Sequence, residues 1–269
     1  MSELKTEVKK EKLWSLAFII ILFINAINGT ATYMVNPNFA DYLVSKGAAF
    51  EFTGLISSLL SWIALLLRPF SGAISDRANK KVVMLISYVV TAVCMMLYSM
   101  TDSLTVLTII RIIHGMAFGV SGTISMAYAT SYIPMERMGE GIGYVGIATL
   151  SSSFIGPQLG DFVVETFGSQ AVFFAAGLLM VVDVLLIFSI KGQKQEVKAK
   201  EVVKKKISFD DFFAKELIFY VLFIGMFSFG NGIISYYLKT MGNARGIPNI
   251  TLFFTAYSLV LFASKPISG

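Results

Sequence analysis

Residues 72–81 read Gly-Ala-Ile-Ser-Asp-Arg-Ala-Asn-Lys-Lys, and they join two long apolar segments of the chain. The segment before this stretch covers residues 53–75, and the segment after it covers residues 82–100. Each segment is close to the ~20 apolar residues that an α-helix needs to cross a membrane. The stretch 72–81 therefore indicates a tight polar turn between two membrane-spanning helices.

The composition of the whole chain supports the same class of protein. The chain has 269 residues, of which 55% are hydrophobic and 14% are charged, and its mean hydropathy is +0.72. Soluble domains have about 45–50% apolar and about 25% charged residues. We expect an all-α membrane protein with membrane-spanning segments at residues 13–35, 53–75, 82–100, 104–130, 139–163, 171–190, 216–238 and 249–269.

The positions of the basic residues predict the orientation in the membrane. Of the 22 lysines and arginines, only Lys46, Lys239 and Arg245 fall in loops on the side opposite the N-terminus, and Arg111 falls inside a span. Cytoplasmic loops of membrane proteins carry the excess of Lys and Arg. We therefore expect a multi-pass protein of the cell membrane with a cytoplasmic N-terminus. This sidedness accounts for the net charge of +5, so we expect no nucleic-acid partner.

Two short patterns occur twice in the chain. Residues 28–33 read NGTATY in the first predicted span, and residues 231–236 read NGIISY in the seventh. Residues 68–72 read RPFSG at the end of the second span, and residues 265–269 read KPISG at the end of the eighth. Because the matches come in the same order, they predict duplication of a six-span unit whose copies cross the membrane in the same sense.

The duplication predicts how the chain is organised. Residues 1–190 would form a six-helix N-terminal transmembrane half, and residues 191–215 a basic cytoplasmic linker. Residues 216–269 would form the first two spans of a C-terminal half. On this interpretation the second half is incomplete, because the chain is truncated after the eighth span.

The turn at 72–81 resembles the loop signature of the major facilitator superfamily, Gly-x-Leu-Ser/Ala-Asp-Arg-x-Gly-Arg/Lys-Arg/Lys. The matching positions are Gly72, Ser75, Asp76, Arg77, Lys80 and Lys81. Ile74 replaces Leu, and Asn79 replaces the second Gly, a mild change because Asn tolerates a left-handed turn. The resemblance implies a major facilitator fold in which this loop is a gate that latches the outward-open state. We expect Gly72 to permit close helix packing there. The alternative is a generic basic cytoplasmic turn.

The fourth span holds Leu107-x-x-x-Arg111-x-x-His114-Gly115, which resembles the family's fourth-span pattern Leu-x-x-x-Arg-x-x-Gln-Gly. Arg111 and His114 are three residues apart, so they share one helix face. The resemblance implies that Arg111 takes part in proton coupling, and His114 is of a type that titrates near physiological pH. The alternatives are an arginine bonded to backbone carbonyls and a histidine that packs as a satisfied polar group.

The fifth span contains Gly156, Pro157, Gly160 and Asp161. These residues are similar to the Gly-Pro-x-x-Gly-Gly signature of the family's proton antiporters, with Asp161 in the last place. The resemblance implies efflux rather than uptake. The alternative is plain helix packing, with Asp161 at the outer water interface.

Further polar residues lie inside predicted spans without a family signature. Asp183 is in the sixth span, where an unpaired carboxylate should pair, take up a proton or face water. It is either a proton or cation site or an interface residue near the cytoplasmic end. Asn25 and Asn28 share a helix face, and together with Tyr33 they are candidates for lining a cavity.

These patterns predict a secondary active transporter that exports small molecules by proton-coupled alternating access. The expected partners are a small-molecule substrate, protons and the lipid bilayer. We expect no cofactor, metal or enzymatic activity, because nucleotide-binding and catalytic motifs are absent from the sequence and Cys94 is the lone cysteine. The alternative is a truncated, non-transporting remnant or an interaction partner in the membrane.

Overall fold

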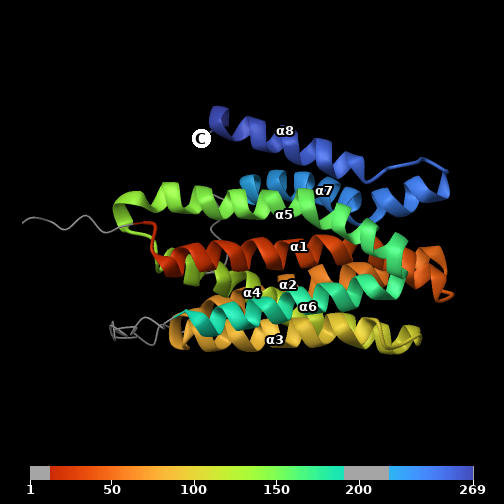
Figure 1. Ribbon diagram of the computed structural model, residues 1–269, viewed down its shortest axis with the longest axis horizontal. Helices are drawn as coiled ribbons and strands as arrows, with labels where there is room; N and C mark the ends of the chain where they lie inside the picture. The colour runs from red at the N-terminus through yellow and green to blue at the C-terminus, as the bar shows by residue number, and fades with distance from the viewer. Residues whose placement is uncertain (1–12, 191–217, 269) are drawn as a thin grey trace, which may run out of the picture.

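A computed structural model of the chain describes residues 13–190 and 218–268 (Figure 1). Within these ranges the regular structure is helical, and no strand occurs. The elements are α1 (Leu16–Ser45), α2 (Phe50–Arg77), α3 (Lys80–Tyr98), α4 (Leu104–Thr130), the short 3-10 helix η1 (Met135–Arg137), α5 (Met138–Phe167), α6 (Ser169–Ser189), α7 (Ile218–Ala244) and α8 (Leu252–Ser268). The predicted linker at 191–215 lies outside the described residues.

Among the described residues, 6 helices are long and apolar enough to cross a membrane, namely α1, α2, α3, α4, α6 and α7. The sequence predicted a span at each of these positions. The Gly- and Ser-rich α5 is not among them, and the apolar part of α8, Leu252–Ala263, is shorter. The predicted all-α membrane protein with several spans is confirmed.

Two predicted helix ends were wrong, and packing explains both. The first span was expected to end at residue 35, but α1 continues through Pro37 to Ser45. Proline removes one backbone hydrogen bond, yet the residues after it are well packed. Tyr42 is buried and its hydroxyl donates to the carbonyls of Tyr98 and Thr101, each at 3.1 Å.

The seventh predicted span was also too short. Its expected end at residue 238 placed Lys239 in a loop, whereas α7 continues to Ala244. Lys239 is therefore inside a helix, and its side chain is buried rather than solvated. A charged residue within a span is costly and normally faces protein or water, so its partners are of functional interest.

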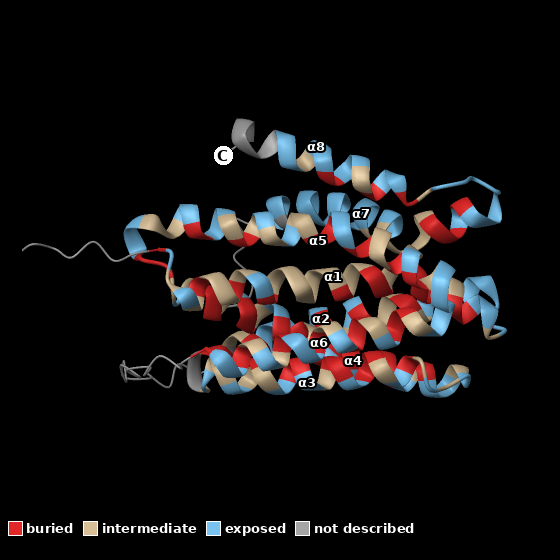
Figure 2. Ribbon diagram, in the orientation of Figure 1, coloured by how far each residue is buried: buried red, intermediate tan, exposed pale blue. Residues whose placement is uncertain are grey.

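Helices α1 to α6 pack into one unit, called here the six-helix bundle (Figure 1). In this bundle α1 contacts α5 and α6, α2 packs on α4, and α3 packs on α4 and α6. Figure 2 shows that buried residues concentrate in the bundle, whereas α7 and α8 are mostly exposed. Helix α7 contacts α1, and α8 contacts α5. The core sits between α1, α3, α4 and α6.

The α2–α4 contact depends on two glycines one turn apart. A Cβ atom added to Gly115 would lie 3.0 Å from the carbonyl oxygen of Leu60, and one added to Gly119 would lie 2.8 Å from the Cα of Ala64. Both neighbours are backbone atoms, so these glycines let the two helix backbones touch. This close packing fixes α4, which carries several of the candidate functional residues.

Candidate functional site

A cavity of about 510 Å³ lies between the six-helix bundle and α7. Its described lining has no charged side chain, and most of the lining residues carry an amide, a hydroxyl or a phenol. The polar lining residues include Asn25, Asn28, Thr32, Tyr33, Asn36, Ser61, Tyr88, Ser121, Ser125, Thr149, Ser228, Asn231, Ser235 and Tyr236. The three residues that the sequence suggested as cavity-lining, Asn25, Asn28 and Tyr33, are all in this set.

The two copies of the short repeat meet across this cavity. Asn28 and Tyr33 come from the first copy in α1, and Asn231 and Tyr236 occupy the corresponding places in α7. The cavity thus has an amide and a phenol on each side, contributed by equivalent positions. Sequence reasoning identified the repeat but did not assign the α7 copy to a site, although the matching letters contained that signal.

Hydrogen bonds hold the polar lining in place. Ser125 on α4 donates to the side-chain oxygen of Asn25 at 3.0 Å, and the Asn25 amide donates to the Ile21 carbonyl at 2.8 Å. The hydroxyls of Ser61 on α2 and Tyr236 on α7 lie 3.2 Å apart. These bonds orient the groups that face the cavity, which is the geometry a small-molecule site needs.

Arg111 is fully buried within the six-helix bundle and does not line the cavity. One guanidinium nitrogen, Nη2, donates to the Ser57 carbonyl on α2 at 3.1 Å. The guanidinium also lies over the ring of Phe39 on α1, 4.1 Å from its centroid. Its Nε and Nη1 have no hydrogen-bond partner among the described residues. The nearest lining residue on α4, Phe118, is seven positions further on, or ~10 Å along the helix axis.

His114 lies near Arg111 and is also buried. Its Nδ1 atom is 3.1 Å from the hydroxyl of Tyr98 on α3, so the imidazole is engaged in the core. Tyr98 itself packs against the rings of Phe39 and Phe173. The arrangement links α1, α3, α4 and α6 around the buried Arg111 and His114.

Asp183 is set apart from that pair. It is fully buried on α6, and neither carboxylate oxygen has a hydrogen-bond partner among the described residues. Tyr88 on α3 is close enough to interact with it electrostatically, and Tyr88 also lines the cavity. The Tyr88 hydroxyl lies 3.5 Å from the Ser125 hydroxyl. Tyr88 thus contacts Ser125, and both residues line the cavity.

Most of the predicted gating loop is helical, and only residues 78 and 79 lie between the two helices. Gly72 and the residues up to Arg77 belong to α2, and Lys80 already begins α3. Asn79, which replaces the second Gly of the family pattern, has an extended backbone with φ −67° and ψ 108°, so no left-handed turn is needed there. Asn79 instead caps α3, accepting a hydrogen bond from the Lys81 backbone at 3.0 Å. An extended cap with a side-chain acceptor suits Asn as well as Gly.

Lys81 and Gly72 have different surroundings. The Lys81 ammonium donates to the carbonyls of Ile190 at 2.5 Å and Phe188 at 3.3 Å, so it neutralises the C-terminal end of α6. A Cβ added to Gly72 would meet no described atom within 4 Å. The side chains of Asp76 and Arg77 lie outside the described part of the structure.

The fifth-span signature lies where α5 crosses α1. A Cβ added to Gly156 would lie 2.9 Å from the Thr30 carbonyl, and one added to Gly160 would lie 3.2 Å from the Met34 carbonyl. Pro157 sits within the same continuous helix. Asp161, one position after Gly160, forms an ion pair with Lys239 of α7. Sequence reasoning missed this partner because it placed Lys239 in a loop.

Comparison with known proteins identifies the kind of chain. A family model described as the Major Facilitator Superfamily matches residues 21–269. "Multidrug resistance protein MdtG" of Enterobacter lignolyticus (strain SCF1) is 27% identical over 183 residues, which are 66% of this chain and 44% of that relative. The protein of the same name from Proteus mirabilis (strain HI4320) is 26% identical over 181 residues, covering 67% of this chain and 43% of the relative. The matched region is thus less than half of each relative.

A solved structure shares the helix arrangement. The "POT family transporter PepTSo" superimposes with a TM-score of 0.58 at 14% sequence identity. The match covers 65% of this chain and 37% of that chain. At this identity the likeness concerns the fold alone.

Proposed function

The chain belongs to the Major Facilitator Superfamily, and from that premise we propose that it works as a secondary transporter that exports small molecules by alternating access. The predicted family is confirmed by the match over residues 21–269. The observation that carries the proposal is the 510 Å³ cavity lined by both copies of the repeat. A site between two equivalent elements can be exposed to either side when one element rocks against the other.

Efflux is the favoured direction for two reasons. The relatives in Enterobacter and Proteus are named multidrug resistance proteins. The α5 segment with Gly156, Pro157 and Gly160 resembles the antiporter signature and packs tightly on α1. The substrate would be a small molecule that accepts hydrogen bonds from amides and phenols, because the described lining carries no formal charge.

Proton coupling would involve Asp183, Arg111 and His114. An unpaired buried carboxylate is unfavourable, so Asp183 is suited to take up a proton and release it when water or a cation arrives. Arg111 lies near His114, and its Nε and Nη1 have no hydrogen-bond partner among the described residues, so the guanidinium would be able to respond to a change in local charge. Tyr88 and Ser125 would connect Asp183 with the cavity.

The orientation is part of the proposal. The bias of Lys and Arg puts the N-terminus and the turn at 72–81 in the cytoplasm, and the cell membrane is the expected location. The C-terminal ends of α1, α5 and α7 would then lie on the outer side of the membrane. Gly72, Asp76, Arg77, Lys80 and Lys81 would form the cytoplasmic gate, with Lys81 holding the end of α6.

The test is flux in proteoliposomes under an imposed pH gradient, with ethidium and a neutral fluorescent dye as probes. We expect proton-driven flux that R111A abolishes at normal membrane levels. D183N mimics a protonated carboxyl, so we expect downhill flux that no longer depends on the gradient. R137A is the matched control, because Arg137 is partly exposed in η1 and forms its ion pair with the nearby Glu140.

Two outcomes would overturn parts of the proposal. Full proton-driven flux in R111A would remove Arg111 from the coupling mechanism. The absence of flux for every probe in the unmodified protein, with the protein present in the membrane, would favour a non-transporting role.

A further inference from the structure

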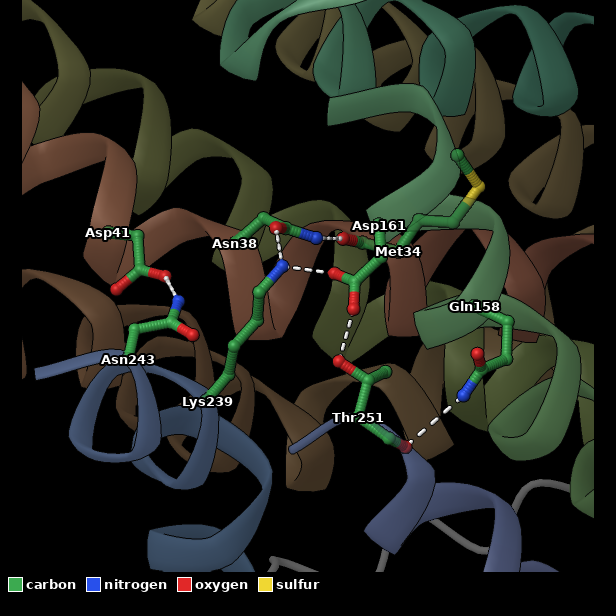
Figure 3. Close-up of polar contacts among 8 residues, drawn as sticks. All are labelled: Met34, Asn38, Asp41, Gln158, Asp161, Lys239, Asn243 and Thr251. Carbon is green, nitrogen blue, oxygen red and sulfur yellow. Dashed lines mark hydrogen bonds and ion pairs between the residues drawn. The ribbon is translucent and has the colours of Figure 1, made fainter. Parts of the chain in front are cut away.

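Lys239 near the end of α7 ties this helix to two helices of the six-helix bundle (Figure 3). Its ammonium forms an ion pair with Asp161 of α5, and it donates to the side-chain oxygen of Asn38 of α1 at 2.5 Å. Lys239 is 8% exposed and Asn38 is 5% exposed, so the contact is largely shielded from water. A single cation thus bridges α1, α5 and α7.

The same carboxylate also holds the start of α8. The second oxygen of Asp161 accepts a hydrogen bond from the hydroxyl of Thr251, which directly precedes α8. One turn earlier in α5, the amide of Gln158 donates to the Thr251 carbonyl at 3.2 Å and to the Thr255 hydroxyl at 2.9 Å. Figure 3 shows these side chains converging from the bundle and from the α7–α8 connection. Both oxygens of Asp161 are therefore used between the bundle and the α7–α8 pair.

The contacts between α7 and the bundle are concentrated at this end. The described residues of α7 from 218 to 230 are exposed, whereas those from 235 to 240 are buried or half-buried. At the same end Asn243 also donates to the Asp41 carboxylate at 3.1 Å. The lining residues Asn231 and Tyr236 precede Lys239 along α7. The described polar contacts between the end of α7 and the bundle thus gather around Asp161 and Asp41.

The place of Asp161 in the sequence sets this chain apart from the pattern it resembles. The antiporter signature ends in two glycines, whereas here the second position is Asp161. Gly160 still provides the close approach to α1. Asp161 adds a negative charge at a position where the pattern has glycine. Lys239 of α7 forms an ion pair with that charge.

We propose that Asp161 and Lys239 form an ion-pair latch that closes the outer end of the transport path and must part each time the cavity opens to that side. The proposal rests on the alternating-access function proposed above. A second cavity of about 650 Å³ is lined by both residues and by Glu165 and Asn243, so there is space for water to hydrate the charges once they separate. The ion pair between Asp161 and Lys239 can therefore hold α5 and α7 together and still separate when the cavity opens to the outer side.

The latch is tested with a disulfide reporter of closure at the same end. Cysteines are introduced by D41C and N243C in a C94S background, because Cys94 is the only native cysteine. Oxidative cross-linking is then measured in membranes without substrate or gradient. We expect D161N and K239Q each to lower the cross-linking rate about fivefold or more, the factor that about 1 kcal/mol gives. The swap D161K/K239D should restore it to about the original rate.

E165Q is the matched control, since Glu165 lies one turn beyond Asp161, lines the same cavity and is exposed. Unchanged cross-linking in D161N and K239Q at normal membrane levels would overturn the latch, whatever the transport result. A swap variant that is present in the membrane and stays as open as the single variants would overturn it too. Reduced cross-linking with rescue by the swap supports the latch even if flux is absent, in which case only the transport proposal falls.

Discussion

The α2–α4 contact offers the sharpest stability prediction, because α4 has two glycines with opposite surroundings. A Cβ at Gly119 would lie 2.8 Å from the Ala64 Cα and 2.9 Å from its carbonyl oxygen, both backbone atoms that no side-chain rotation can move. A Cβ at Gly122, three positions later in the same helix, would meet no described atom within 4 Å. The substitutions G119A and G122A therefore add the same methyl group to two different environments.

The expected magnitudes follow from these distances. Replacing Gly by Ala inside a helix gains about 0.5–1 kcal/mol from backbone entropy, and both variants share this gain. G119A must also push α2 and α4 apart, and overpacking of this kind costs about 1–3 kcal/mol. The difference between the variants isolates the packing cost. It corresponds to a lower Tm for G119A than for G122A by roughly 2–12 °C.

The protein contains its own reporter for this measurement. Cys94 is buried on α3 and is the only cysteine, so a thiol-reactive fluorogenic dye reports unfolding when the solubilised protein is heated. We expect G122A to match or slightly exceed the unmodified protein. Equal Tm values for G119A and G122A would refute the reasoning, because they would show that the helices do not touch at Gly119.

Two further predictions concern the end of α6 and the cavity. K81M should lower the Tm relative to K80M, because the Lys81 ammonium donates to the Ile190 carbonyl at the end of α6. A cation at a helix C-terminus contributes about 0.3–1 kcal/mol to stability. Equal melting curves for the two variants would contradict this prediction. N28A and N231A should each raise the apparent KM for an exported dye, because the two amides line the same cavity. The loss of one hydrogen bond of about 0.5–1.5 kcal/mol corresponds to a rise of about 2–12-fold. Flux assays that show no change in either variant would exclude the amides from binding.

Much of the fold could be predicted from local sequence. A run of about 20 apolar residues in a bilayer has to form a helix, since only a helix satisfies its own backbone hydrogen bonds. The turn at 72–81 and the repeated NG…Y pattern were visible in the sequence, so the family resemblance and the duplication could be predicted from it, whereas the meeting of the two copies at one cavity could not. The helix ends were harder. Nothing local indicated that α1 would pass Pro37, because burial of Tyr42 and its neighbours decides that.

The composition of the sites depended on the tertiary structure. The sequence singled out Asp161 and Arg111, but it could not name Lys239 or Ser57 as their partners, which lie 78 and 54 positions away. Such partners are set by which helix faces meet and at what depth. The amino-acid sequence was therefore sufficient to predict the class of protein, the six helices that are long and apolar enough to cross a membrane, and several residues worth examining. Only helix packing decided that Lys239 is a buried bridge rather than a loop residue, because a lysine's free energy within a span depends on whether a carboxylate faces it.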